Sequence, residues 1–248
     1  MKLTIFSTPK PFLKDIQVIQ RNAIQSWMAV EPRPEIILMG QDYGVMETAA
    51  EFRLLHIPVI QTNEFGTPLV NDIFAKGEAA AKGDVLCYIN TDIIVPPILH
   101  QVIERIAASM ERFLAIGQRY DVQVNGVIDF TAPDWHQRIP IEGEVRLHQH
   151  WGVDYFIYNR PPPWGTPVPA FYLGRLAWDN WLVRKALDNE VPVIDATQIL
   201  KMVHQNHDKG HYAGGLSNPE VIHNQLLLGS TPIAGVKHAT HSMGFKGD

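Results

Sequence analysis

The first 118 residues alternate short apolar runs with longer stretches in which apolar residues recur every three or four positions. The runs have the length and composition of buried strands and cover residues 3–7, 35–40, 57–62, 85–89 and 113–117. The longer stretches have the spacing of one helix face and cover residues 13–27, 46–55, 69–81 and 98–112. Strands that alternate with helices predict an α/β protein, with a mainly parallel sheet between two helical layers.

The second half, residues 119–248, has weaker periodicity and many turn signals, and it holds most of the tryptophans. We expect a strand over 154–159, a helix over 178–187, a strand over 191–195 and an irregular tail after Gly210. No linker separates the halves, so residues 1–248 are expected to form a single α/β/α domain with a loop-rich second half.

Composition excludes several classes of function. The net charge of −5 lacks the basic surplus of a nucleic-acid binder. The single cysteine, Cys87, excludes an internal disulfide and a thiolate metal cluster. No apolar run reaches the roughly 18 residues of a membrane span, and the amino-terminal segment lacks a signal-peptide core. A cytoplasmic protein is therefore expected.

A polar triplet, Asn90-Thr91-Asp92, directly follows the run 85–89. Ligands of parallel α/β sheets bind beyond the carboxyl ends of the strands, where this triplet is expected. The sequence contains neither G-x-G-x-x-G after the first strand nor G-x-x-x-x-G-K-[ST]. A phosphate-bearing ligand would then need a divalent cation, and Asp92 is a candidate to hold it. Alternatively, Asp92 is a turn or cap acid before Pro96-Pro97.

The segment "AAAKGD…INTD" resembles the part of GT-A glycosyltransferases that carries the D-x-D motif, here as N-x-D. The resemblance covers roughly residues 1–210. It implies a GT-A-like fold with a nucleotide-binding half, 1–118, and an acceptor-side half, 119–248. It also implies that Asp92 holds Mn²⁺ or Mg²⁺ against the diphosphate of a nucleotide-sugar, and that Asn90 is a further oxygen ligand or contacts the ribose.

Two later segments extend the resemblance. "YLGRLAWDNWLVRKAL" is similar to the acceptor-side segment of family-2-like enzymes, which implies that Asp179 is the catalytic base and that Trp178 and Trp181 stack on sugars. The alternative is a plain helix cap at Asp179 with both tryptophans in the core. "HWGVDYFIYNR" resembles the strand near the donor sugar and implies that Asp154 binds sugar hydroxyls; otherwise it is a turn acid.

Three histidines, His204, His207 and His211, are spaced to share one face of a helix. The resemblance implies that a histidine near the carboxyl terminus is a further metal ligand, and His204 and His207 are favoured because Gly210 precedes His211. A separate three-histidine zinc site remains an alternative, although H-E-x-x-H is absent. A polar loop is the third possibility.

The scaffold suggests further contacts, each of which could instead be a solvated surface residue. Ser7 and Thr8 follow the first strand and are candidates for contact with the base or ribose, and Asp42 for contact with the base. Asn71 and Lys76 lie on the helix expected to face the nucleotide. Arg175 is a candidate to offset the charge of the leaving diphosphate. The stiff segment 161–165 is a candidate lid or rim.

The expected function is metal-dependent transfer of a sugar from a UDP- or GDP-sugar to a hydroxyl acceptor, with inversion if Asp179 is the base. Two alternatives remain open. One is nucleotidyl transfer on a similar sheet, disfavoured because "FSTPKPF" contains Lys10 but no glycine. The other is a non-catalytic nucleotide-sugar or carbohydrate binder, which Asn90 keeps open.

Overall fold

The computed structural model describes residues 1–207 and 215–244. The alternation of strands and helices in the first half is confirmed. The strands are β1 (Leu3–Ser7), β2 (Glu35–Met39), β3 (Leu55–Ile57), β4 (Val85–Ile89) and β6 (Leu114–Ile116). The helices between them are α1 (Lys14–Met28), α2 (Val45–Phe52), α3 (Val70–Ala80) and α4 (Leu99–Ser109).

The boundary between α2 and β3 differs from the expectation. The helix expected over 46–55 ends at Phe52, because Arg53 takes a left-handed conformation with φ 56°. The strand expected over 57–62 therefore starts earlier, at Leu55, and is complete at Ile57. A left-handed residue at a helix end stops the helix by turning the chain, and sequence periodicity does not reveal it.

The large sheet has the strand order β12-β10-β6-β9-β4-β1-β2-β3. Its later strands are β9 (Tyr155–Asn159), β10 (Val193–Asp195) and β12 (His241–Ser242). Neighbouring strands are parallel except β9, which runs antiparallel to both β4 and β6. The mainly parallel sheet predicted from the sequence is confirmed, and the antiparallel β9 brings residues just before Tyr155 beside the carboxyl end of β4.

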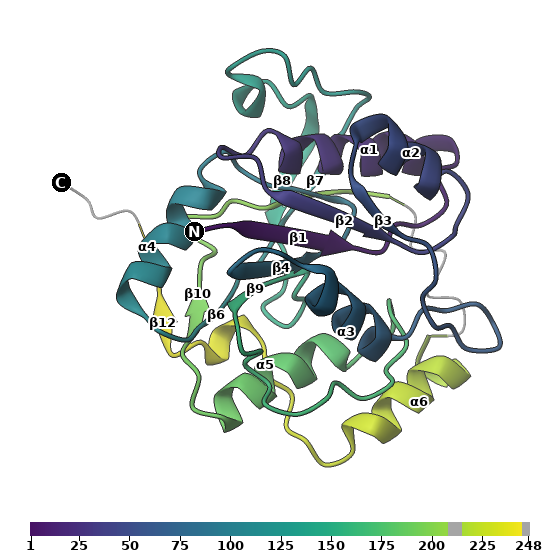
Figure 1. Cartoon of the computed structure of the whole chain (residues 1–248), viewed down its shortest axis with the longest axis vertical. Coiled ribbons are helices and arrows are strands. Elements are labelled where there is room, and N and C mark those ends of the chain that lie inside the picture. The colour runs from purple at the N-terminus through teal and green to yellow at the C-terminus, as the bar shows by residue number, and fades with distance from the viewer. Residues whose placement is uncertain (208–214, 245–248) are drawn as a thin grey trace.

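Helices cover both faces of this sheet, as Figure 1 shows. Side chains of α1, α2 and α4 pack into one hydrophobic cluster, and those of α3 and of α5 (Trp178–Asp188) pack into another. Along β4, Cys87 belongs to the first cluster and its neighbours Leu86 and Tyr88 to the second. Burial on both faces explains why the central strands are apolar runs without alternation.

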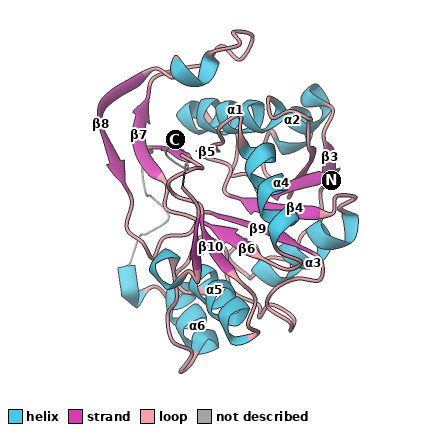
Figure 2. Ribbon diagram, turned by 90° about the vertical axis from the view of Figure 1, so that its left-hand side faces the viewer, coloured by secondary structure: helices cyan, strands magenta, loops and turns pink. Residues whose placement is uncertain are grey.

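A smaller sheet, which the sequence analysis did not predict, has the order β5-β11-β7-β8. Its strands are β5 (Ile93–Ile94), β11 (Val203–Gln205), β7 (Tyr120–Val124) and β8 (Ile141–Leu147). It lies beside the large sheet in Figure 2. Two of its strands are very short and β8 is exposed along its whole length, so none gives a buried apolar run. His204 lies in strand β11 and not in a helix, so the expectation that it shares a helix face with the other histidines is wrong.

The expectation of an irregular tail is also wrong, because α6 spans Pro219–Leu228. Asn218 caps this helix by accepting the backbone N–H of Glu220, and Pro219 occupies its first turn. Short 3-10 turns span Trp135–Gln137, Gly215–Ser217 and Val236–His238. In the part of the chain that the structure describes, no helix is both long enough and apolar enough to cross a membrane.

Candidate functional site

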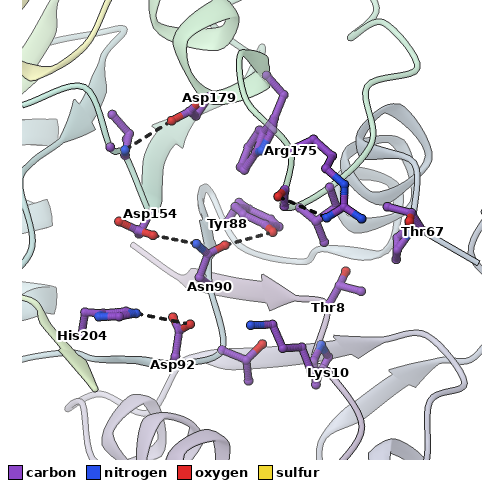
Figure 3. Close-up of a pocket in the computed structure, with 18 of the residues that line it drawn as sticks. Thr8, Lys10, Thr67, Tyr88, Asn90, Asp92, Asp154, Arg175, Asp179 and His204 are labelled. Carbon is purple, nitrogen blue, oxygen red and sulfur yellow. Dashed lines mark hydrogen bonds and ion pairs between the residues drawn. The ribbon is translucent and has the colours of Figure 1, made fainter. Parts of the chain in front are cut away.

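A pocket of about 720 Å³ opens where β1 and β4 end and where β9 begins. Nine of the twelve predicted catalytic, nucleotide-site and metal residues line it: Thr8, Asp42, Asn90, Asp92, Asp154, Arg175, Asp179, His204 and His207. Figure 3 shows most of these side chains converging on the same space. The fold therefore gathers residues from both halves of the chain at the strand ends, where ligands of such sheets bind.

Three other predicted residues do not reach this pocket. Ser7 is fully buried, and its hydroxyl donates to the Ile89 carbonyl at 2.5 Å, so its role is to anchor the loop after β4. Lys76 donates to the Val59 carbonyl and to Asp72, both at 2.8 Å. Asn71 lines a separate cavity between α3 and residues 161–168. The expected contacts of these residues with a nucleotide in the main pocket are not supported, because Ser7 is buried in β1 and the two α3 residues meet other neighbours.

Asp92, His204 and His207 form a compact group whose ligand atoms all lie within 4.8 Å of one another. His207 Nε2 lies 3.0 Å from Asp92 Oδ2, and His204 Nε2 lies 3.7 Å from the same oxygen. The third histidine of the motif, His211, lies outside the described residues. The β5–β11 pairing creates this group, since Ile93 is the partner of His204 in the register.

The chemistry of this group fits a divalent cation. Burial raises the pKa of Asp92, but the hydrogen bond with His207 and the charges of His204 and Lys10 outweigh it, so the pKa lies well below its usual range. The second oxygen, Oδ1, is buried without a hydrogen-bond partner among residues 1–207 and 215–244. One carboxylate with two imidazoles suits Mn²⁺ better than Mg²⁺, which prefers oxygen ligands.

The side chain of Asn90 already has two hydrogen-bond partners in the pocket, and its role as a further oxygen ligand stays a prediction. Its Nδ2 donates to Asp154 Oδ1 at 2.8 Å, and its Oδ1 accepts from the Tyr88 hydroxyl at 3.3 Å. Asp154 is placed there because β9 runs antiparallel to β4, with Tyr155 paired to Ile89. Asp154 Oδ2 is buried and, within the described residues, has no hydrogen-bond partner. A free acceptor at this position can bind a ligand hydroxyl.

A charged network that sequence reasoning missed lies next to these residues, and two of its members, Arg119 and His148, also line the pocket. Arg119 Nε donates to Asp121 Oδ1 at 2.9 Å, and Arg119 Nη1 donates to Asp154 Oδ1 at 2.5 Å. His148 Nδ1 lies 2.7 Å from Asp121 Oδ2, and His204 Nδ1 lies 3.1 Å from Asp121 Oδ1. Burial raises the pKa of Asp121, but its contacts with the histidines and the arginine hold that pKa well below the usual range. No motif spacing indicated these residues, because β7 was not predicted.

Asp179 lies in the first turn of α5, as predicted, at the other side of the pocket. Its Oδ2 accepts the backbone N–H of Val153 at 3.4 Å. Burial is the main cause that raises its pKa to about 7; backbone hydrogen bonds from Asn180 and Val153 oppose this rise, and the charge of Asp154 adds to it. A carboxyl group with this pKa can exchange a proton near neutral pH.

The expected sugar-stacking role of Trp178 and Trp181 is not supported by the structure. Both side chains are only 5% exposed and belong to the core cluster beneath α5. Trp178 borders the pocket but exposes little surface, whereas Trp151 lines the same pocket and is 51% exposed. Its backbone carbonyl accepts from Asn180 Nδ2 at 3.0 Å, so the helix that carries Asp179 also holds the loop that carries Trp151.

The remaining pocket residues differ in how freely they can meet a ligand. Arg175 forms an ion pair with Glu220 of α6, with Nε at 2.9 Å from Oε2, so this guanidinium is already neutralised. Lys10, which follows β1, faces Asp92, as Figure 3 shows. Burial lowers the pKa of Lys10, and the charge of Asp92 opposes the shift. Thr8 Oγ1 is buried without a described partner. Asp42 lies exposed at the pocket rim.

Comparison with solved structures bears on the fold. The structure of residues 1–349 of S. aureus TarS in complex with UDP-GlcNAc superimposes with a TM-score of 0.58 at 12% identity, over 86% of this chain and 61% of that one. The chain has the GT-A fold. The UDP complex of TarS 1–349 gives a TM-score of 0.51 at 13% identity, over 84% of this chain and 59% of that one. A further structure of S. aureus TarS gives a TM-score of 0.52 at 14% identity, over 84% of this chain and 36% of that one.

The expectation of a GT-A-like α/β/α sandwich is thus confirmed. The chain spans about three fifths of the length of the TarS 1–349 structures that it matches. No protein-family profile matches the sequence. No curated protein matches it either. Of the three comparisons, only the one with solved structures gave matches, so by comparison the GT-A fold is recognised from the structure and not from the sequence.

Proposed function

We propose that this protein is a metal-dependent glycosyltransferase that moves a sugar from a nucleotide-diphosphate sugar to a hydroxyl acceptor. The observation that carries the proposal is the pocket itself: a carboxylate with two histidines lies on one side of it, and Asp179, with a pKa of about 7, lies on the other. A GT-A scaffold solved with UDP-GlcNAc in TarS supports a UDP-sugar as the donor.

Asp92, His204 and His207 would hold the cation, and their donor set fits Mn²⁺ better than Mg²⁺. When bound there, it would neutralise negative charge on the diphosphate as that group departs. Lys10 adds a second positive charge on the same side of the pocket. Arg175 is a weaker candidate for this task than the sequence suggested, because Glu220 already neutralises it.

The donor sugar would occupy the space between the two ends of the pocket. Asp154 presents its Oδ2 there, which has no hydrogen-bond partner among residues 1–207 and 215–244, and Asn90 and Arg119 fix its other oxygen. A buried acceptor without a partner is costly, so a sugar hydroxyl that donates to it would bind with useful energy. This contact would also orient the anomeric carbon toward Asp179.

Asp179 is proposed to be the general base. Its carboxylate takes the proton from the acceptor hydroxyl while that oxygen forms a bond to the anomeric carbon. The bond from the anomeric carbon to the diphosphate oxygen breaks, and its electron pair leaves with the diphosphate. Direct displacement of this kind inverts the configuration at the anomeric carbon. A pKa of about 7 leaves a sizeable fraction of Asp179 ionised at neutral pH.

The test is release of nucleoside diphosphate from UDP-GlcNAc, UDP-glucose and GDP-mannose, with MnCl₂ or with EDTA, and with simple hydroxyl acceptors. We expect release that depends on Mn²⁺ and is lost in Asp179→Asn. Binding of a nucleotide-sugar without any turnover would replace the proposal with a binding function. Release of pyrophosphate from a nucleoside triphosphate would instead indicate nucleotidyl transfer.

A further inference from the structure

Asp121 lies directly behind His204, on the neighbouring strand of the small sheet. The parallel pairing of β7 and β11 places the two residues opposite each other in the register. Asp121 Oδ1 lies 3.1 Å from His204 Nδ1, whereas His204 Nε2 faces Asp92. Asp121 does not line the pocket, although His204 does. The two nitrogens of one imidazole therefore face two different carboxylates.

This arrangement decides which nitrogen of His204 is available to a cation. Asp121 is also contacted by Arg119 Nε at 2.9 Å and by His148 Nδ1 at 2.7 Å, so cationic and N–H groups surround it. The 3.1 Å contact with His204 Nδ1 is within ion-pair distance but outside hydrogen-bond geometry, so Asp121 acts on this nitrogen through its negative charge, which favours the proton on Nδ1. The lone pair then lies on Nε2, the nitrogen on the side of Asp92.

Arg119 connects this contact to the other half of the site. Its side chain is only 12% exposed and lies between Asp121 of the small sheet and Asp154 at the start of β9 in the large sheet. The rigid planar guanidinium has five N–H donors in fixed directions, so one arginine can bond two carboxylates at once and hold them in a set geometry. The relative position of the cation group and of Asp154 therefore depends on Arg119.

We propose that Asp121 and Arg119 are positioning residues of this site. Asp121 fixes the ring of His204 with Nε2 toward the cation, and Arg119 holds Asp121 and Asp154 in register across the two sheets. This inference rests on the cation site of the proposed function. It goes beyond that function because Asp121 does not line the pocket, and the role given to Arg119, which does line it, is to hold two carboxylates rather than to bind the cation. An outer-shell carboxylate of this kind contributes roughly 10- to 100-fold to metal affinity.

The experiment measures binding of MnCl₂ alone to the full chain by isothermal titration calorimetry, without any nucleotide. His204→Ala is the reference for loss of a ligand. Asp121→Ala is expected to raise the dissociation constant for Mn²⁺ about 10- to 100-fold. Asp121→Asn keeps an acceptor but loses the charge, so its effect is expected to be smaller. If the alanine variant does not fold, the asparagine variant still gives a measurable shift.

Asp72→Ala is the matched control. Asp72 is also a buried, ion-paired carboxylate, bound to Lys76 at 2.8 Å and to the Gln61 N–H at 2.7 Å, but it lies away from the cation group. We expect it to lower the melting temperature without changing the Mn²⁺ dissociation constant. A purely structural role of Asp121 would give the same result. Wild-type affinity in both Asp121 variants, or no Mn²⁺ binding by the wild type, would overturn the proposal.

The role of Arg119 is tested by a double-mutant cycle with Arg119→Lys and Asp121→Asn, again on the Mn²⁺ dissociation constant. Residues that act through one network give non-additive effects. We expect the double variant to bind Mn²⁺ only slightly more weakly than Asp121→Asn. Additive losses would remove Arg119 from the proposal. Wild-type Mn²⁺ binding without turnover of any nucleotide-sugar would instead contradict the proposed function and leave the test of these two residues intact.

Discussion

His207 Nε2 lies 3.0 Å from Asp92 Oδ2, although 115 residues separate the two in the chain. Asp92 comes just before β5, and His207 comes two residues after β11 ends. Because β5 and β11 are antiparallel, the beginning of one lies beside the end of the other. A pairing of only two residues thus brings the acid of the N-x-D motif to the histidines.

Replacing Asp92 with Asn should remove the stabilisation of the protein by MnCl₂. The carboxylate is the one negative ligand in the Asp92, His204 and His207 group, and its loss leaves two neutral imidazoles. Thermal shift measurements over a range of MnCl₂ concentrations check this, since a ligand of the folded state raises its apparent stability. Asp42→Asn, on the exposed rim of the same pocket, should keep the wild-type shift. A full shift in Asp92→Asn would show that Mn²⁺ binds elsewhere.

The pH dependence of turnover should report Asp179. The base is active when ionised, so kcat/KM is expected to rise with pH up to about 7 and then to level off. Asp179→Asn should lower kcat by about 10²- to 10⁴-fold, the usual contribution of a general base. The checking measurement is the rate of diphosphate release between pH 5 and pH 9, values chosen at roughly two pH units either side of the pKa. A rate that is independent of pH around 7 would argue against this base.

The same group should affect stability with a definite sign. The pKa of Asp179 is raised from 3.8 to about 7 in the folded protein. Its contribution to stability is therefore fully present below about pH 4 and is lost as pH rises to about 7. Asp179→Asn has no ionisable group here and so has no such loss. The urea midpoint of the variant should therefore exceed that of the wild type by more at about pH 8, above the raised pKa, than at about pH 4, near the unfolded pKa. Equal differences at both pH values would show that burial does not raise this pKa.

Trp151 should contribute to acceptor binding, in place of the buried Trp178 and Trp181. It is half exposed, lines the pocket, and its loop is held by Asn180 next to Asp179. Trp151→Ala should raise the KM for the acceptor about 10-fold while Trp151→Phe, which keeps an aromatic face, should raise it less. Trp181→Phe, in the core, is a control for stability. An acceptor KM that is unchanged in Trp151→Ala would contradict a binding role.

The pattern of apolar residues in the sequence was sufficient to predict the central strands and the helices of the first half. The central strands β1, β2 and β4 are buried on both faces, so each appears as an apolar run. The helices of the first half bury one face, which gives their three-to-four spacing. These two signals placed Asp92 at a strand end and Asp179 at a helix start, and both lie in the pocket.

The sequence did not reveal what depends on pairing between distant segments. The small sheet is built from short or exposed strands, so Asp121 and Arg119 carried no recognisable signal. Trp178, Trp181 and Trp151 are chemically alike, and packing alone decided that the first two are buried and the third is open.

The amino-acid sequence by itself therefore determined the α/β alternation and the two acids at the ends of its elements, because hydrophobic periodicity is a local property of the chain. Only the tertiary structure decided which histidine nitrogen faces Asp92, which carboxylates Arg119 joins, and how far burial shifts the pKa of Asp179. Those properties arise from strand register and from desolvation, and both depend on residues that are far apart in the sequence.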